Sequence, residues 1–241
     1  MPIHILDQDL LQPRPGDTRL LIYLARIQDI YDYQVDMGRL GYQLDYLRVT
    51  DNQWETLRRA RRADFSDDTL IYDSDLELAI EPRLFRDTRF IDPQDIEDDA
   101  LRERMEDQFY YDKTAYFLVR ETTVGNDTRE EVLAMNLAPT AVIQDGAVQT
   151  EHSLSGSVAQ VDPQGETITL TGIRTWNGLS RRWESTAGTQ TFDAAKAVIL
   201  LNDRPFNADE LWRVRTGAQA FLIQNRTTSE DTTPYVIILE Q

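Results

Sequence analysis

Short stretches in which apolar and polar residues alternate dominate the second half of the chain. Residues 155–162 and 167–173 alternate with a period of two, and turn-forming residues 163–166 separate them. Further apolar runs lie at 197–201, 220–224 and 235–239, with turn signals at 177–178 and 202–203. Period-two alternation between turn residues is typical of antiparallel strands. The pattern predicts five or six short strands between residues 154 and 241.

The same order of patterns recurs in the first half. Four segments of the first copy have counterparts in the second: 25–29 with 158–162, 53–55 with 182–184, 63–65 with 190–192, and 116–123 with 220–228. Four matches in one order predict an internal duplication. They also predict that Trp54 and Trp183 are structurally equivalent and at least half buried.

We therefore expect a mainly all-β chain of two tandem small antiparallel β-barrels or sandwiches, with one short helical insert in the first copy. The helix of that insert is predicted to begin at Asp92-Pro93, as N-cap and first helical residue. Asp145-Gly146 predicts a hairpin turn in the linker. The predicted segments are an N-terminal arm 1–17, a first module 18–137 with the insert at about 74–112, a linker 138–153 and a second module 154–241.

Composition excludes several classes of function. The 241 residues carry 42 acidic and 25 basic side chains, a net charge of -17, which disfavours nucleic acid as a partner. There are no cysteines, and His4 and His152 are the only histidines, so thiolate chemistry and most catalytic constellations are absent. No nucleophile-elbow, phosphate-loop or zinc-protease motif occurs. We expect a protein that is not an enzyme and has no cofactor, with Ca²⁺ as the single candidate ion.

The basic residues are almost all arginine, since Lys113 and Lys196 are the only lysines. Either nucleotide composition or a surface rich in Arg–carboxylate pairs explains this bias.

The compartment stays open. No apolar run is long enough to predict a membrane span, and the N-terminus shows no signal peptide. An extracellular or cell-surface chain written without its leader and an intracellular or virion protein both fit.

A candidate metal site lies in the acidic segment 73–77. On a strand, Asp73, Asp75 and Glu77 would project from one face, and Asp67-Asp68 lies just upstream. Carboxylates of this kind suit Ca²⁺. The alternative is a solvated acidic edge that discourages strand-to-strand aggregation.

A candidate ligand platform for a carbohydrate or peptide consists of aromatic residues, whose more common fate is core packing. A nucleic-acid site of this type would also need a basic groove. The segment 58–62 is the only basic cluster, and acids surround it. The candidate platform residues are Tyr42, Tyr46, Trp54 and Trp176.

The N-terminal arm is apolar but precedes a stiff proline-containing elbow at 13–15. A detached apolar strand needs a partner, because its backbone groups and side chains both seek pairing. It either folds back onto its own barrel or adds to a neighbouring subunit as an assembly arm. The apolar residues of the arm are Ile3, Ile5, Leu6, Leu10 and Leu11.

The second copy resembles small β-barrel modules of bacterial cell-surface proteins, particularly S-layer-associated chains of Firmicutes. The resemblance rests on the order of segments 156–162, 167–171, 183–184, 198–202, 206–211 and 220–223, and extends in weaker form to 18–136. The first copy departs by its acidic insert, and no anchoring motif of that family is present. The resemblance implies a structural or assembly role outside the cell, with no catalytic residues to carry over.

The leading hypothesis is a non-enzymatic structural protein whose partner is itself, a homo-oligomer or polymer that builds an extracellular surface layer or filament. One alternative is a structural component of a phage or injection particle. The other is a carbohydrate- or peptide-binding β module.

Overall fold

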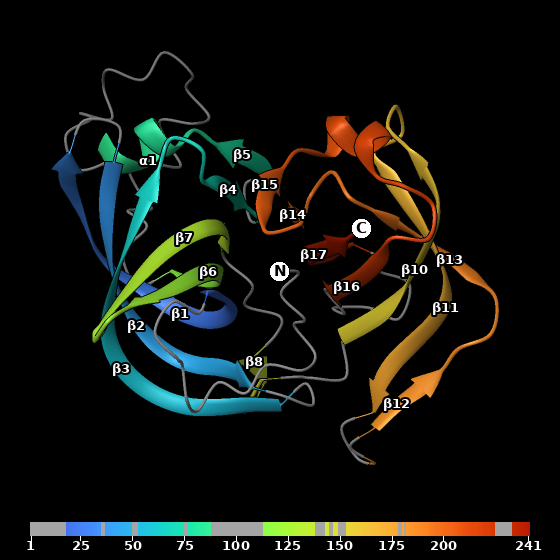
Figure 1. The fold of residues 1–241 in the computed structure, drawn as a ribbon, viewed down its shortest axis with the longest axis horizontal. Helices are drawn as coiled ribbons and strands as arrows, with labels where there is room; N and C mark the ends of the chain where they lie inside the picture. The colour runs from blue at the N-terminus through green and yellow to red at the C-terminus, as the bar shows by residue number, and fades with distance from the viewer. Residues whose placement is uncertain are drawn as a thin grey trace.

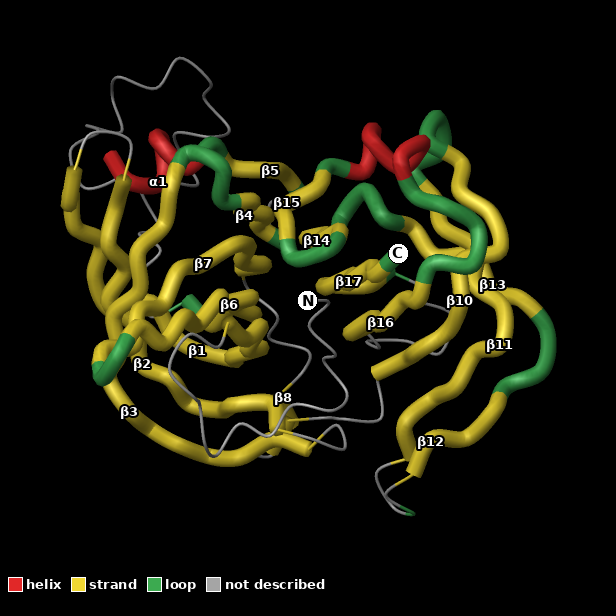
Figure 2. The backbone as a smooth tube through the Cα atoms, in the orientation of Figure 1, coloured by secondary structure: helices red, strands yellow, loops and turns green. Residues whose placement is uncertain are grey.

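The computed structural model describes residues 18–34, 37–49, 53–74, 77–87, 113–137, 143–144, 147–148, 153–177, 180, 182–224 and 233–241. Most of these residues lie in strands of two large sheets, and a third sheet of two short strands lies in the linker. Figures 1 and 2 show the two large sheets as two modules side by side. The prediction of a mainly β chain is confirmed.

The first module is a closed barrel. Its strand order is β3-β2-β1-β6-β7-β4-β5, and a parallel pairing of β3 with β7 at Asp64 and Glu131 closes it. Bulges bend the long strands around the barrel, as between Ile27 and Asp29. Its elements are β1 (Thr18–Gln34), β2 (Met37–Val49), β3 (Gln53–Ser66), β4 (Leu70–Asp73), β5 (Leu78–Ile80), helix α1 (Pro82–Asp87), β6 (Thr114–Val124) and β7 (Asp127–Leu137).

The second module repeats this order as a curled sheet, β12-β11-β10-β16-β17-β14-β15, with β13 also paired to β11. Two shorter strands, β12 and β13, replace the single long β3, and Gly188 with a φ of 93° bends the chain between them. No strand pairing among the described residues closes this sheet into a barrel. Its elements are β10 (Ser153–Asp162), β11 (Thr167–Asn177), β12 (Arg182–Ser185), β13 (Thr189–Asp193), β14 (Val198–Leu201), β15 (Arg204–Phe206), a 3-10 helix (Ala208–Arg213), β16 (Gln219–Gln224) and β17 (Pro234–Glu240).

The strand order agrees element by element between the modules, as the predicted duplication requires. In each, after an intervening hairpin and short helix, a later strand returns to lie beside the first, β6 beside β1 and β16 beside β10, as in a Greek key. In each, the last strand also pairs in parallel with a short strand, β7 with β4 and β17 with β14.

The strand register tests the predicted equivalence of the two tryptophans. Trp54 on β3 pairs with Arg48 of β2, and Trp183 on β12 pairs with Trp176 of β11. Arg48 follows Leu47, the partner of Tyr23 on β1, and Trp176 follows Thr175, the partner of Leu154 on β10. Both tryptophan pairs therefore lie at the same position of the ladder. The equivalence is confirmed. Trp183 is partly buried, and the side chain of Trp54 lies outside the described residues.

Three of the four predicted matches are out of register with the strand ladders. The matches of 25–29 and of 63–65 are each wrong by two residues, which keeps the same sheet face, and the match of 116–123 is wrong by one. Phe117 points into the first barrel, whereas Phe221 packs between the two modules. The ladder partners show that the true counterpart of Phe117 is Leu222, because each pairs with the residue two places before the buried leucine of the last strand. The similarity of the two segments thus aligned residues that lie on opposite faces of their sheets.

The helical insert also differs from the prediction. Helix α1 follows β5 just as the 3-10 helix follows β15, so the hairpin and the short helix belong to both copies. The extra residues fall after the helix: 26 residues separate α1 from β6, against five between the 3-10 helix and β16. The helix predicted from Asp92-Pro93 and the N-terminal arm 1–17 both lie outside the described residues.

Two predicted hairpin turns agree with the observed strand pairing. Strands β8 (Ile143–Gln144) and β9 (Ala147–Val148) pair across Asp145-Gly146 in the linker. In the turn between β10 and β11, the carboxylate of Asp162 accepts the backbone N–H groups of Gln164 and Gly165 at 3.1 Å.

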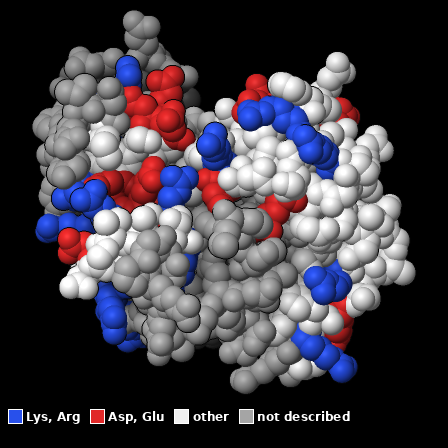
Figure 3. All heavy atoms as spheres, in the orientation of Figure 1, with Lys and Arg blue, Asp and Glu red and all other residues white. Residues whose placement is uncertain are grey.

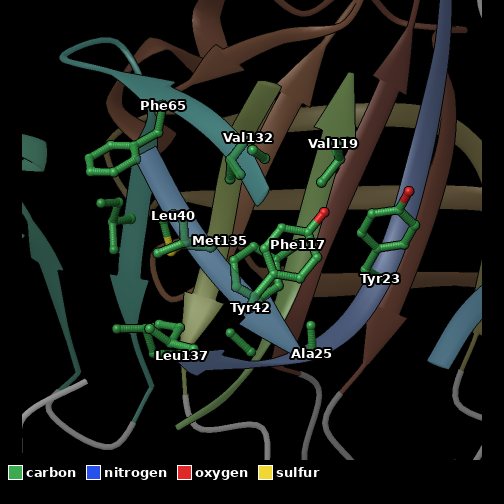
Figure 4. Packing of buried hydrophobic residues seen from close by; sticks show 14 of the residues in the cluster. Tyr23, Ala25, Leu40, Tyr42, Phe65, Phe117, Val119, Val132, Met135 and Leu137 are labelled. Atoms are coloured by element: carbon green, nitrogen blue, oxygen red, sulfur yellow. The ribbon is translucent and has the colours of Figure 1, made fainter. Parts of the chain in front are cut away.

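Each module has its own apolar core, formed by the inward-facing side chains of its strands. In the first barrel, Figure 4 shows Tyr42 and Phe117 at the centre, surrounded by side chains from β1, β2, β3, β6 and β7. The rings of these two residues stack with centroids 5.2 Å apart. The helix α1 adds Phe85, whose ring meets Phe65 edge to face at 5.7 Å.

A third apolar layer joins the modules. It consists of fifteen buried residues from the outward faces of β1, β4, β6 and β7 in the first module and of β14, β16 and β17 in the second. Tyr116 and Tyr235 meet across it with ring centroids 5.7 Å apart. Asn136 donates a hydrogen bond from Nδ2 to the backbone carbonyl of Tyr235 at 3.0 Å. We call this the shared layer: Leu20, Ile22, Leu24, Tyr72, Tyr116, Leu118, Leu133, Ala134, Val198, Leu200, Phe221, Ile223, Tyr235, Val236 and Ile238.

The shared layer predicts that the modules unfold together. Replacing the fully buried Leu118 by alanine should lower the free energy of unfolding by about 2–5 kcal/mol. Three of the four tryptophans lie in the second module, so their fluorescence should report the shift although Leu118 is in the first. Urea unfolding followed by fluorescence and circular dichroism should give one coincident transition.

Val124→Ala is the matched control, since Val124 is 61% exposed and its truncation should change stability by less than about 0.5 kcal/mol. Two separate transitions, with the fluorescence transition unmoved by Leu118→Ala, would show that the modules are energetically independent.

Candidate functional site

The acidic residues of the candidate metal site do not share a strand face. Strand β4 ends at Asp73, and the chain turns before β5, with Glu77 at a φ of 53°. Asp73 is fully buried, and its Oδ2 lies 2.9 Å from Nζ of Lys113. Glu77 is exposed and lies 2.7 Å from Nζ of Lys196 in the second module. Asp75 lies outside the described residues.

The two lysines of the chain therefore form ion pairs with Asp73 and Glu77, the two described carboxylates of this segment. The alternative of a solvated edge is also wrong for Asp73, which is a buried ion-pair partner. Among the described residues, no group of three or more histidine or carboxylate side chains is placed to hold a metal ion.

The aromatic platform is not assembled on an exposed face. Tyr42 is fully buried inside the first barrel, and Trp176 is 4% exposed, with its ring edge-on to Trp183 at 5.6 Å. These two residues are core residues and cannot stack on a ligand. The side chains of Tyr46 and Trp54 lie outside the described residues.

The most concentrated polar chemistry is a buried carboxylate inside the first barrel. Glu130 on β7 accepts hydrogen bonds from the hydroxyl groups of Tyr23 at 3.1 Å and Tyr42 at 2.6 Å. The guanidinium of Arg61 on β3 forms an ion pair with the same carboxylate. Four strands thus meet at one carboxylate, next to the single residue pair through which β3 and β7 close the barrel.

The environment of Glu130 changes the acidity of its partners. Burial, and then the carboxylate of Glu130, raise the pKa of Tyr23 and Tyr42 above the ordinary value of 10. Burial opposes the charge of Arg61, but Glu130 together with Tyr23 and Tyr42 outweighs this effect, so the pKa of the guanidinium is raised. Both tyrosines are therefore neutral hydrogen-bond donors and the arginine is a fixed cation. This set links four strands of the barrel, and its two tyrosines keep their protons at neutral pH.

A groove of about 730 Å³ lies between the two modules. Its walls come from the turn before β4, from β5 and β7 in the first module, and from β15 in the second. A hollow of about 350 Å³ continues it towards Glu166 and shares Leu70, Ala79 and Phe206 with it. Figure 3 shows the notch between the modules, with carboxylates gathered on the side of the first.

A tight turn and one arginine fix this groove. Asn202 and Asp203 both have positive φ, 48° and 64°, as the two-residue hairpin between β14 and β15 requires. The turn presents the carbonyl oxygen of Asp203, which accepts a hydrogen bond from Nη2 of Arg120 at 2.9 Å. Nη1 of Arg120 also donates to Glu131 at 3.1 Å, so this arginine connects both walls.

The groove lining carries four carboxylates and two guanidinium groups, Arg120 and Arg204. Asp67 is paired with Arg83 at 2.7 Å, and Glu131 is paired with Arg120. Asp68 and Glu81 have no ion pair among the described residues. The groove therefore has a net negative lining with two carboxylates available to a partner.

Sequence reasoning marked Asp67-Asp68 and the Asn202-Asp203 turn but missed Glu81, Arg120 and Arg204. These residues line one groove only because the two modules pack together, and no local sequence motif indicates this.

No model of a protein family matches this chain, and no curated protein matches it significantly. Among the described residues, none of the helices is long and apolar enough to cross a membrane.

Replacing Glu130 by alanine should lower the free energy of unfolding by about 3 kcal/mol, because two buried hydroxyl groups and a guanidinium lose their common acceptor. The neighbouring Glu131→Ala removes a more exposed pair with Arg120 and should cost less than about 1 kcal/mol. Urea unfolding of both variants measures the difference. Equal losses in the two variants would contradict the structural role of the buried carboxylate.

The buried tyrosines predict a loss of stability at high pH. The pKa of Tyr23, Tyr42 and Tyr116 is raised chiefly by burial, and burial raises that of Tyr72 to about 12. Unfolded tyrosines ionise near 10, so the unfolded state binds fewer protons above that pH and stability falls as the pH rises. Absorbance titration should show these four of the ten tyrosines ionising only above pH 10 or with unfolding. Ionisation of all ten near pH 10 in the folded protein would contradict the burial.

Proposed function

We propose that this chain is a non-enzymatic structural protein, a building block that assembles with further copies of itself into an extracellular surface layer or filament. The observation that carries the proposal is the shared layer. Linked modules commonly move relative to each other unless their interface is large and apolar. Here fifteen buried residues unite two modules into one stiff body, which is what a repeating unit of an assembly requires.

The use of the polar residues supports the same conclusion. The buried carboxylates of Glu130 and Asp73 are committed to structural partners, Arg61 and Lys113. The buried position of Tyr42 and Trp176 removes the main support for a carbohydrate- or peptide-binding platform.

The sheet edges favour contacts through side chains over strand addition. The first barrel closes by pairing β3 with β7 at Asp64 and Glu131, and β15 has Pro205 at its middle residue. Proline cannot donate a ladder hydrogen bond, so it blunts an edge strand. We therefore expect copies to meet through surface side chains, in a contact that depends on charge and shape.

Size-exclusion chromatography with light scattering, and negative-stain electron microscopy, test the proposal with and without millimolar Ca²⁺. We expect species much larger than the 27.9 kDa chain, with a regular repeat in the images. A strictly monomeric protein at high concentration under both conditions would overturn the proposed function.

A further inference from the structure

The basic segment 58–62 lies on β3, where the strand bulges. Between Leu44 and Tyr46 on β2, the partner on β3 moves from Arg59 to Thr56, so β3 holds one residue more than its neighbour. Arg58 takes a φ of 51° at this bulge, a left-handed conformation that non-glycine residues rarely adopt. Bulges re-aim side chains, and backbone strain of this kind concentrates at functional sites.

The arginines of the segment divide into two groups. Arg61 turns into the barrel and pairs with Glu130. Arg58 and Arg59 are exposed and have no ion pair among the described residues. In a chain with a net charge of -17, two adjacent arginines left without such pairs at a bulge form an unusual surface. We call these two residues the arginine bulge.

The groove between the modules has the complementary character. It is concave, its lining is net negative, and Asp68 and Glu81 lack ion pairs among the described residues. The lining also includes apolar residues, of which Leu70 is partly exposed. Such a lining suits the aliphatic stems of arginine while the carboxylates take the guanidinium groups.

We propose that the arginine bulge of one copy docks into the groove between the modules of a second copy, so that Arg58 and Arg59 meet Asp68 and Glu81. This inference rests on the proposed function and names the surfaces of its self-association. The occupant is a second copy because the same chain carries both halves of the contact, one convex and basic, the other concave and acidic.

The two surfaces lie on different sides of the molecule. In Figure 1, β3 follows the lower left edge, and Figure 3 shows basic side chains there, whereas the notch opens at the top. A contact between two different surfaces is heterologous, and it produces a ring or an open filament rather than a two-fold dimer. Charge complementarity would set the register and speed association.

Charge reversal tests the contact. The bulge variant Arg58→Glu/Arg59→Glu and the groove variant Asp68→Arg/Glu81→Arg each place like charges opposite each other. Each alone should raise the protein concentration at which assemblies appear by about tenfold or more, since like-charge juxtaposition is costly. An equimolar mixture of the two variants should assemble again, because the acidic bulge of one then fits the basic groove of the other. Sedimentation and electron microscopy measure assembly.

Matched controls change the same charge elsewhere on exposed residues without ion pairs among the described residues. Arg129→Glu/Arg215→Glu matches the bulge variant, and Asp127→Arg/Asp209→Arg matches the groove variant. Both controls should assemble as the unmodified protein does. Thermal unfolding of all variants identifies any loss that comes from misfolding.

The absence of cysteine allows a second measurement that does not depend on charge reversal. A mixture of Arg59→Cys and Glu81→Cys proteins should form a disulfide-linked dimer of one copy of each under mild oxidation. A mixture of Arg129→Cys and Glu81→Cys should not, because Arg129 lies outside the contact.

The outcomes separate this inference from the proposed function. If the unmodified protein assembles, and the reversed variants assemble equally well or fail to recover on mixing while folded, the docking contact is overturned and the structural function stands. Absence of the Arg59–Glu81 cross-link in an assembling protein overturns it as well. If the unmodified protein never assembles, the proposed function falls, and the docking contact falls with it.

Discussion

The burial of both faces of the same strands is the constraint on which the architecture depends. In β7 every residue from Val132 to Leu137 is buried, and in β17 the same holds from Pro234 to Leu239. One face of β7 packs into the first barrel and one face of β17 packs into the core of the second module, while the other face of each strand packs into the shared layer. With no solvent-facing side, these strands tolerate polar groups only where a partner is supplied. Asn136 meets this condition through the carbonyl of Tyr235.

This constraint explains which parts of the fold could be predicted from the sequence. Strands such as β11, with one solvated face, show the alternation of 167–173, and the turns at 163–166 and 145–146 follow from residue chemistry. The run 235–239 was correctly predicted as a strand, but an unbroken apolar run does not say what covers its second face. The shared layer, and the groove beside it, therefore could not be found from local patterns.

The predictions for individual residues failed for related physical reasons. Tyr42 belongs to an aromatic stripe, yet barrel closure decides which of two opposite faces is inside, and it places this ring against Phe117. Asp73 and Glu77 lie four residues apart, a spacing that suits one face of a strand, but the turn between β4 and β5 separates them and each forms an ion pair with a lysine. Of the acidic residues at the groove, Asp67 and Asp68 stand out in the sequence, but the groove itself also depends on Arg120 and on a turn in the other module.

The faces that meet in the shared layer are largely the same face of the two copies: β4, β6 and β7 correspond to β14, β16 and β17. Two identical modules meeting in this way would form a self-complementary, two-fold dimer. The duplicated chain is therefore a covalent version of such a dimer, in which the association no longer depends on protein concentration. The sequences of the two modules can then diverge without loss of their association, and each module can carry a surface that the other lacks. A head-to-tail polymer needs two different contact surfaces on each subunit. This chain can provide them, because its two copies already pair with each other within one molecule.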